Sequence, residues 1–168
     1  MNSKINQPAA AICAGFNAGA QAQRLLKDDM SAGKFVEALI EKKKFSDAID
    51  FMAHALPARE GIWWGCLCMR DALGDKLAPP DRDAASAAVH WVIDPNEQTR
   101  AAARASAAAC GSMSIAGALA IAAGESSAPA QSIARAVKIA AIKDPANISR
   151  VQRCYVELAM QIAEGQLL

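Results

Sequence analysis

A group of polar residues near position 55 has the side chains that general acid–base chemistry uses. His54 closes one predicted helix, and Arg59 and Glu60 open the next. With Asp47 or Asp50 on the preceding helix, they could pass a proton at one corner. No nucleophile or metal ligand joins them, so an Arg–carboxylate pair that holds the corner is the favoured interpretation. No catalytic residue is therefore assigned, and a ligand-binding or enzymatic corner is kept as an alternative.

The cysteines and histidines do not have metal-ligand spacing. Cys66 and Cys68 lie two apart on a predicted helix, so their thiols point to nearly opposite sides. His54 and His90 are the only histidines, and a zinc site would need ligands from several helices. We expect the five cysteines to be reduced, apolar core residues, and we expect no metal.

The sequence contains no motif of a cofactor enzyme, such as a Walker A loop or a GxGxxG turn, so no cofactor is expected. Its net charge of +1 provides no electrostatic attraction to nucleic acid or to an anionic membrane. The longest weakly polar stretch, 113–124, is far shorter than the roughly 20 residues of a membrane span. We therefore expect a cytoplasmic protein that neither binds nucleic acid nor inserts into a membrane.

Two adjacent tryptophans, Trp63 and Trp64, are candidates for a partner-binding surface. Tryptophan is enriched at the energetic centres of protein interfaces. Neighbouring residues on a helix diverge by about 100°, so at most one faces a partner if the other is core. We predict a partner surface of Arg59, Glu60, Trp63 and Trp64, and burial of both tryptophans is the alternative.

The composition favours an all-α fold. About 40 of the 168 residues are alanine, the best helix former and a poor strand former. The length fits a single domain, residues 1–168. Within it, 1–8 is predicted to be a flexible tail, 9–75 an aromatic-rich first half, and 81–165 an alanine-rich second half.

The segment 58–70 is predicted to be the central helix. It has apolar residues on two sides, which is typical of a helix buried on two sides. Gly61 and Gly65 each weaken a helix by about 1 kcal/mol relative to alanine. Since they lie four apart, they make one smooth groove in which another backbone could lie close.

Three proline corners connect the predicted helices. His54 and Pro57 mark the first. At the second, Asp94 is the predicted N-cap and Pro95 the first helical residue, with Glu97 completing a capping box. The third corner, Asp144-Pro145, has the same pattern.

The corners suggest an internal repeat. Residues 84–100 align without a gap on 134–150, at an offset of 50. Each unit would be an antiparallel helix pair, and a stack of such pairs is the architecture of helical repeat proteins. Chance similarity between alanine-rich segments is the alternative. We expect either a repeat-like stack or an irregular bundle, with about seven to nine helices.

Residues 51–66, FMAHALPAREGIWWGC, resemble the "LA-x-ALP-x-REAVWWAC" core of an uncharacterised family of bacterial helical proteins. Gly61 and Gly65 depart from that pattern, because alanine is usual at both positions. The resemblance implies an all-helical fold and a bacterial source. It also suggests a link with accessory genes of secretion systems, type VI in particular.

These patterns favour a non-catalytic interaction module, an adaptor or accessory subunit of a bacterial multiprotein system. Its partner would be another protein, and a homo-oligomer is left open. That function requires an apolar patch or groove near the two tryptophans. The alternatives are an effector-binding chaperone or immunity protein, and a small enzyme or ligand-binding domain. The last requires a pocket that holds His54, Arg59 and Glu60 together.

Overall fold

The structure, a computed structural model, describes residues 4–125 and 127–167. This part of the chain forms ten α-helices and no strand, which confirms the all-α prediction and exceeds the seven to nine helices expected. The bounds of the helices are α1 Ala9–Cys13, α2 Ala20–Leu25, α3 Ala32–Glu41, α4 Phe45–Ala55, α5 Ala58–Leu73, α6 Pro79–Ile93, α7 Glu97–Ala107, α8 Ile115–Gly124, α9 Ala130–Ala141 and α10 Ile148–Ala163.

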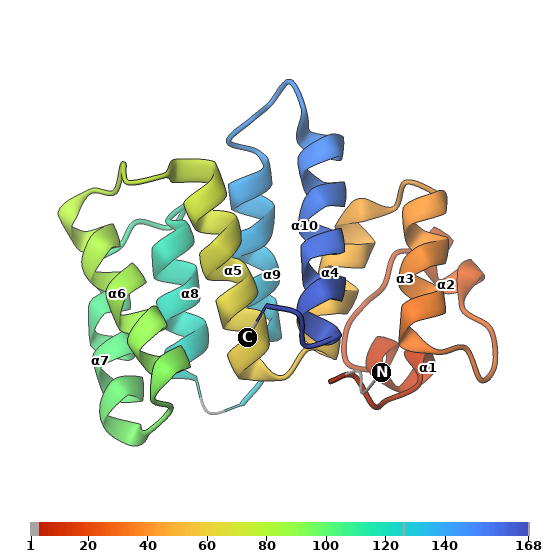
Figure 1. The fold of residues 1–168 in the computed structure, drawn as a ribbon, viewed down its shortest axis with the longest axis horizontal. Helices are drawn as coiled ribbons and strands as arrows, with labels where there is room; N and C mark the ends of the chain where they lie inside the picture. Colours follow the sequence, from red (N-terminus) through yellow and green to blue (C-terminus); the bar gives the residue numbers. More distant parts are fainter. Residues whose placement is uncertain (1–3, 126, 168) are drawn as a thin grey trace.

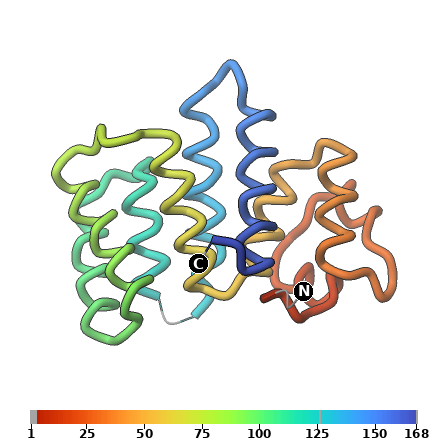
Figure 2. The backbone as a smooth tube through the Cα atoms, viewed as in Figure 1, coloured from red at the N-terminus to blue at the C-terminus, as the bar shows by residue number. Residues whose placement is uncertain are grey.

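From α3 onward, successive helices run in alternating directions, as Figures 1 and 2 show. α6, α7 and α8 lie on one side of α5, and α4 and α3 lie on the other, with α1 and α2 at the edge (Figure 1). The helix pairs at the offset of 50 have different surroundings. α6 and α7 pack on each other and on α8, whereas α10 packs mainly on α4 and only slightly on its sequence neighbour α9.

α5 is the central helix, as predicted. It packs against α6, α8, α9 and α10. Both of its glycines receive a side chain from a neighbouring helix: a Cβ on Gly61 would lie 2.9 Å from Ile133 Cδ1 of α9, and one on Gly65 would overlap Leu119 Cδ2 of α8. The predicted groove therefore exists, and side chains rather than a backbone fill it.

The alanine-rich half is held together by α8. Nearly every residue of this helix is buried, and among its larger side chains only Ile121 is markedly exposed. α8 contacts α5, α6, α7 and α9, so it is surrounded by helices. Small side chains on a helix that is apolar on all sides allow four neighbours to approach closely.

The prediction of Asp94 as an N-cap and Pro95 as the first helical residue is wrong. Asp94 follows the end of α6, and Asn96 caps α7 instead. The Asn96 side chain accepts a hydrogen bond from the Thr99 amide at 2.9 Å, and Thr99 Oγ1 accepts one from the Asn96 amide at 3.2 Å. This reciprocal capping box satisfies the backbone amides of Asn96 and Thr99 at the start of α7.

At the other two proline corners, the helix also begins later in the sequence than predicted. Asp144 and Pro145 lie in the turn before α10, and the Asp144 carboxylate accepts hydrogen bonds from the Asn147 amide group. Pro57 occupies the N-cap position of α5, one residue before the first helical position. All three prolines are thus outside the helices that they precede.

The predicted tail, 1–8, is packed against the domain over its described residues, and 1–3 lie outside them. The Lys4 amide donates to the Ala163 carbonyl at 2.7 Å, and Lys4 Nζ lies 2.9 Å from Glu60 Oε1. The Ala9 amide donates to the Met30 carbonyl at 3.0 Å. Residues 4–8 therefore form a strap that is attached at both ends.

We predict that Gly65→Ala lowers the free energy of unfolding by about 1–3 kcal/mol, because Leu119 is fully buried and cannot move aside without strain. Urea titration measures this change. Gly33→Ala on α3 is the matched control: its Cβ meets no atom within 4 Å, so stability should hold or rise by up to about 1 kcal/mol.

Gly65→Ala in a Leu119→Ala background tests whether the loss of stability comes from the clash with the Leu119 side chain. Removing the Leu119 side chain opens the space, so Gly65→Ala should there cost less than it does in the wild type. An equal cost in both backgrounds would contradict the contact as the reason.

Candidate functional site

Trp64 belongs to the core, which corrects its assignment to a partner surface. Its side chain is 0% exposed, and its indole N–H donates to the Tyr155 carbonyl of α10 at 2.8 Å. The Tyr155 hydroxyl in turn donates to Asp71 at 3.0 Å. Trp64 therefore fastens α10 to α5 and is not accessible to a partner.

Trp63 lies at the surface, as the divergence of adjacent helical residues requires. It is partly exposed, and its indole N–H donates to the Leu167 carbonyl at 3.1 Å. A groove of about 310 Å³ begins at this side chain. The residues that line it come from α5, the following loop and α6: Trp63, Cys66, Leu67, Met69, Arg70, Gly74, Leu77 and Val89.

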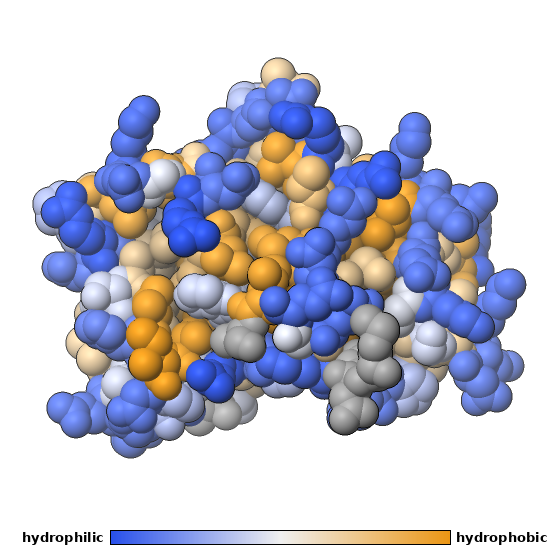
Figure 3. All heavy atoms as spheres, in the orientation of Figure 1, coloured by the Kyte–Doolittle hydropathy of each residue, from blue (hydrophilic) through white to orange (hydrophobic). Residues whose placement is uncertain are grey.

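The groove at Trp63 is mainly apolar. Within the part of the chain that the structure describes, Arg70 is the one charged residue of this lining, and it is exposed. Figure 3 shows hydrophobic atoms gathered over α5 and the adjacent part of α6, with hydrophilic side chains around them. The exposed apolar groove that an interaction module requires is therefore present beside α5.

Arg59 and Glu60 are occupied within the chain. Arg59 Nε donates to the Val92 carbonyl at 2.7 Å, which ties the start of α5 to the end of α6. The Glu60 side chain is only 12% exposed and pairs with Lys4. Arg59 nevertheless remains exposed, whereas Glu60 is mostly covered and is paired within the chain.

His54 faces away from Arg59 and Glu60. Its ring stacks on Phe16 with a centroid separation of 4.7 Å, and Nδ1 lies 2.8 Å from the Asp50 carbonyl. A carbonyl can only accept, so Nδ1 is the donor in this hydrogen bond. The three residues of the predicted corner thus point to three different neighbours.

A second groove, of about 810 Å³, contains His54 together with residues that sequence reasoning missed. Lys138 of α9 donates to both Asp50 carboxylate oxygens at 2.6 Å. Asp50 and Lys138 are 88 positions apart, so no local pattern relates them. Arg135 also lines the groove, and its guanidinium donates to the Ser112 carbonyl. The described residues of this lining include no serine, threonine or cysteine to act as a nucleophile.

Residues 35–163, more than half of the chain, match a family of unknown function, DUF6931. The chain belongs to this family. Neither the curated proteins nor the solved structures include a match. The match begins within α3 and ends with α10, so it includes both tryptophans, whereas the strap, α1 and α2 lie outside it.

The other candidate groups of this DUF6931 chain are buried or dispersed. Burial raises the pKa of the Cys66 thiol to about 12 and also raises the pKa of Cys68. Burial, with the neighbouring Asp71, raises the pKa of Tyr155. Over residues 4–125 and 127–167, no group of three or more His, Cys, Asp or Glu side chains is placed to hold a metal. No helix in that part has the length and apolar character to cross a bilayer.

The two tryptophans should respond differently to truncation. Trp64→Ala should lower the free energy of unfolding by about 3–5 kcal/mol, because it leaves a cavity beside α10 and removes a buried hydrogen bond to the Tyr155 carbonyl. Trp63→Ala should cost about 1 kcal/mol, since it removes one exposed hydrogen bond and a partly buried ring. Urea unfolding of both variants checks the ranking, and equal losses would contradict the assignment of core and surface.

Stability should fall as the pH rises above about 9, where an ordinary thiol titrates. The native Cys66 thiol keeps its proton to about pH 12, while the unfolded chain releases it near 9.0. The unfolded state therefore binds fewer protons over this range, and the free energy of unfolding falls by up to about 1.4 kcal/mol per pH unit for this group.

Urea titrations at about pH 8 and pH 10 measure this loss. Cys66→Ala is the matched comparison, because it leaves Tyr155 and Cys68 in place and should show a shallower pH dependence. An identical dependence in the wild type and in Cys66→Ala would exclude the thiol as its source.

Proposed function

We propose that this chain is a non-catalytic protein-interaction module that binds a partner protein through the groove at Trp63. The observation that carries the proposal is a partly exposed tryptophan beside an apolar groove on the central helix. Tryptophan is enriched at the energetic centres of interfaces, where a rigid ring fills a pocket of the partner. Trp63, Leu67 and Val89 would form the apolar centre of that contact.

The proposed occupant is a partner helix with an apolar face and an acidic residue at one end. Leu67 and Arg70 follow Trp63 along one side of α5, so the groove runs parallel to a helix axis. An amphipathic helix laid in an apolar groove is a recurring mode of recognition. The exposed guanidinium of Arg70 favours a carboxylate at the end of the groove.

A role as an adaptor or accessory subunit of a bacterial multiprotein system fits this surface. The link with secretion systems, type VI in particular, rests on the resemblance of residues 51–66 to the bacterial family. A cytoplasmic location is part of the same proposal. Binding of one cognate effector by a chaperone or immunity protein would use the same groove. The alternative of a small enzyme or ligand-binding domain would use His54 with Asp50 and Lys138 in the second groove, because Arg59 and Glu60 have partners elsewhere.

Affinity purification of the tagged protein from its native host, with quantitative mass spectrometry, tests the proposal. The wild type should capture one protein in a reproducible ratio, and Trp63→Ala should weaken binding of the purified pair at least about tenfold. Met113→Ala is the matched control, because Met113 is 58% exposed and lies outside the groove.

A partner that binds Trp63→Ala and the wild type equally would overturn the proposed surface. Absence of any stoichiometric partner would overturn the interaction function itself. A second copy of the chain as the captured protein would show that the groove is a dimer contact, measurable by sedimentation of the wild type and of Trp63→Ala.

A further inference from the structure

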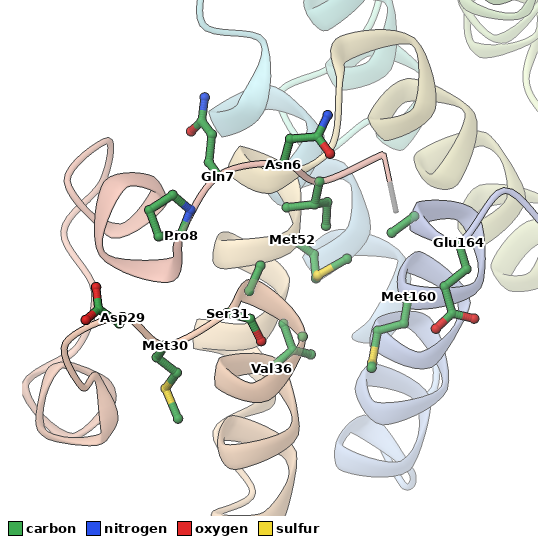
Figure 4. Close-up of a pocket in the computed structure, with 14 residues that line it drawn as sticks. Asn6, Gln7, Pro8, Asp29, Met30, Ser31, Val36, Met52, Met160 and Glu164 are labelled. Atoms are coloured by element: carbon green, nitrogen blue, oxygen red, sulfur yellow. The ribbon is translucent and has the colours of Figure 1, made fainter. Parts of the chain in front are cut away.

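A separate cavity of about 600 Å³ lies under the strap formed by residues 4–8. Its walls come from the strap, from residues 29–33, and from α3, α4 and α10. Figure 4 shows Val36, Met52 and Met160 around the space between α3 and α10, with Asn6 and Gln7 of the strap above it. Part of this wall lies outside residues 35–163, so the cavity combines the family region with a segment before it.

Methionine dominates the apolar lining. Met30, Met52 and Met160, half of the six methionines in the chain, line this one cavity with Val36 and Ala163. Methionine is unbranched and polarizable, so it adapts to ligands of different shapes. The volume lies within the range of sites for small molecules, about 300–1,000 Å³. The cavity therefore has the size and the lining for a flexible apolar group.

The charge at the rim is negative. Among the described residues of the lining, Asp29 and Glu164 are the charged ones, and both are exposed. Neither forms an ion pair with another described residue. Asp29 and Glu164 stand on opposite sides of the cavity, and the side chains of Asn6 and Gln7 extend above it (Figure 4). A headgroup on either side of the rim would therefore meet one carboxylate, which repels an anion and attracts a cation.

The walls of the cavity are fixed in position before any ligand enters. Hydrogen bonds hold the strap at Lys4 and at Ala9, and Pro8 forms an antiparallel bridge with Ser31. The Lys4 ammonium is paired with Glu60, and neither residue lines the cavity. The charge of Lys4 therefore does not offset the two carboxylates at the rim. A site with fixed walls loses little entropy when it binds.

We propose that this cavity binds a small organic cation with an apolar tail. The tail lies among Met30, Met52 and Met160, and the ammonium group lies at the rim beside Asp29 or beside Glu164, which stand on opposite sides of the cavity (Figure 4). Binding here is independent of the groove at Trp63, because that groove is lined by α5, the loop after it and α6 and shares no lining residue with this cavity.

Octylammonium, octanol and octanoate are the probes, because they have the same tail and differ in charge. In the full chain with 13C-labelled methionine methyl groups, octylammonium should shift the signals of Met30, Met52 and Met160 saturably. Met69 and Met113 line other regions and serve as internal controls. Affinity should fall from octylammonium through octanol to octanoate, by about fivefold at each step.

Two variants separate the roles of charge and cavity. Asp29→Asn with Glu164→Gln should remove the preference for octylammonium over octanol; Asn suits Asp29 because its φ is 58°. Met160→Lys should abolish octylammonium binding by placing a cation in the site. Met113→Lys, at an exposed position outside the cavity, should leave binding unchanged.

Equal affinities for the three probes, or shifts at Met69 and Met113 as large as those in the cavity, would overturn the proposal. Octanoate binding more tightly than octylammonium would also overturn it. Saturable binding of a basic peptide, with no shift from octylammonium, would assign the cavity to a protein partner and refute the small-molecule proposal.

Discussion

The close packing of α5 against its neighbours is the constraint on which the rest of the structure depends. Gly61 and Gly65 leave room for Ile133 and Leu119, so α8 and α9 lie against one side of the helix. Each glycine weakens the helix by about 1 kcal/mol, a cost that close packing of buried side chains offsets. With α8 and α9 on that side and α10 joined through Trp64, Trp63 is the tryptophan left at the surface.

Polar side chains in this fold mostly connect helices to one another. Arg59 bonds the last turn of α6, Glu60 holds the strap through Lys4, and Asp50 holds α9 through Lys138. Each contact joins segments that are distant in the sequence, and exposed or half-exposed pairs of this kind contribute up to about 1 kcal/mol each. Their main effect is to fix the positions of the helices relative to one another.

The sequence predicted the features that depend on composition and local spacing. Alanine content indicated an all-α fold, and the spacing of Gly61 and Gly65 indicated close packing at the centre. It failed where two local solutions compete: Asp94 and Asn96 are both good caps, and only Thr99 Oγ1, by returning a hydrogen bond, decides for Asn96. It also could not foresee Lys138 beside Asp50, because such pairs arise from tertiary packing alone.

The hydrogen bond of Trp63 restricts what can bind in its groove. The indole N–H already donates to the Leu167 carbonyl, in the segment that turns back after Gly165, whose φ of 78° suits glycine. A partner that displaced this segment would have to supply another acceptor, since a buried N–H without one costs about 1–3 kcal/mol. A partner that leaves Leu167 in place avoids this cost. The partner helix that we propose would therefore approach along Leu67 and Val89 and cover only the face of the indole ring.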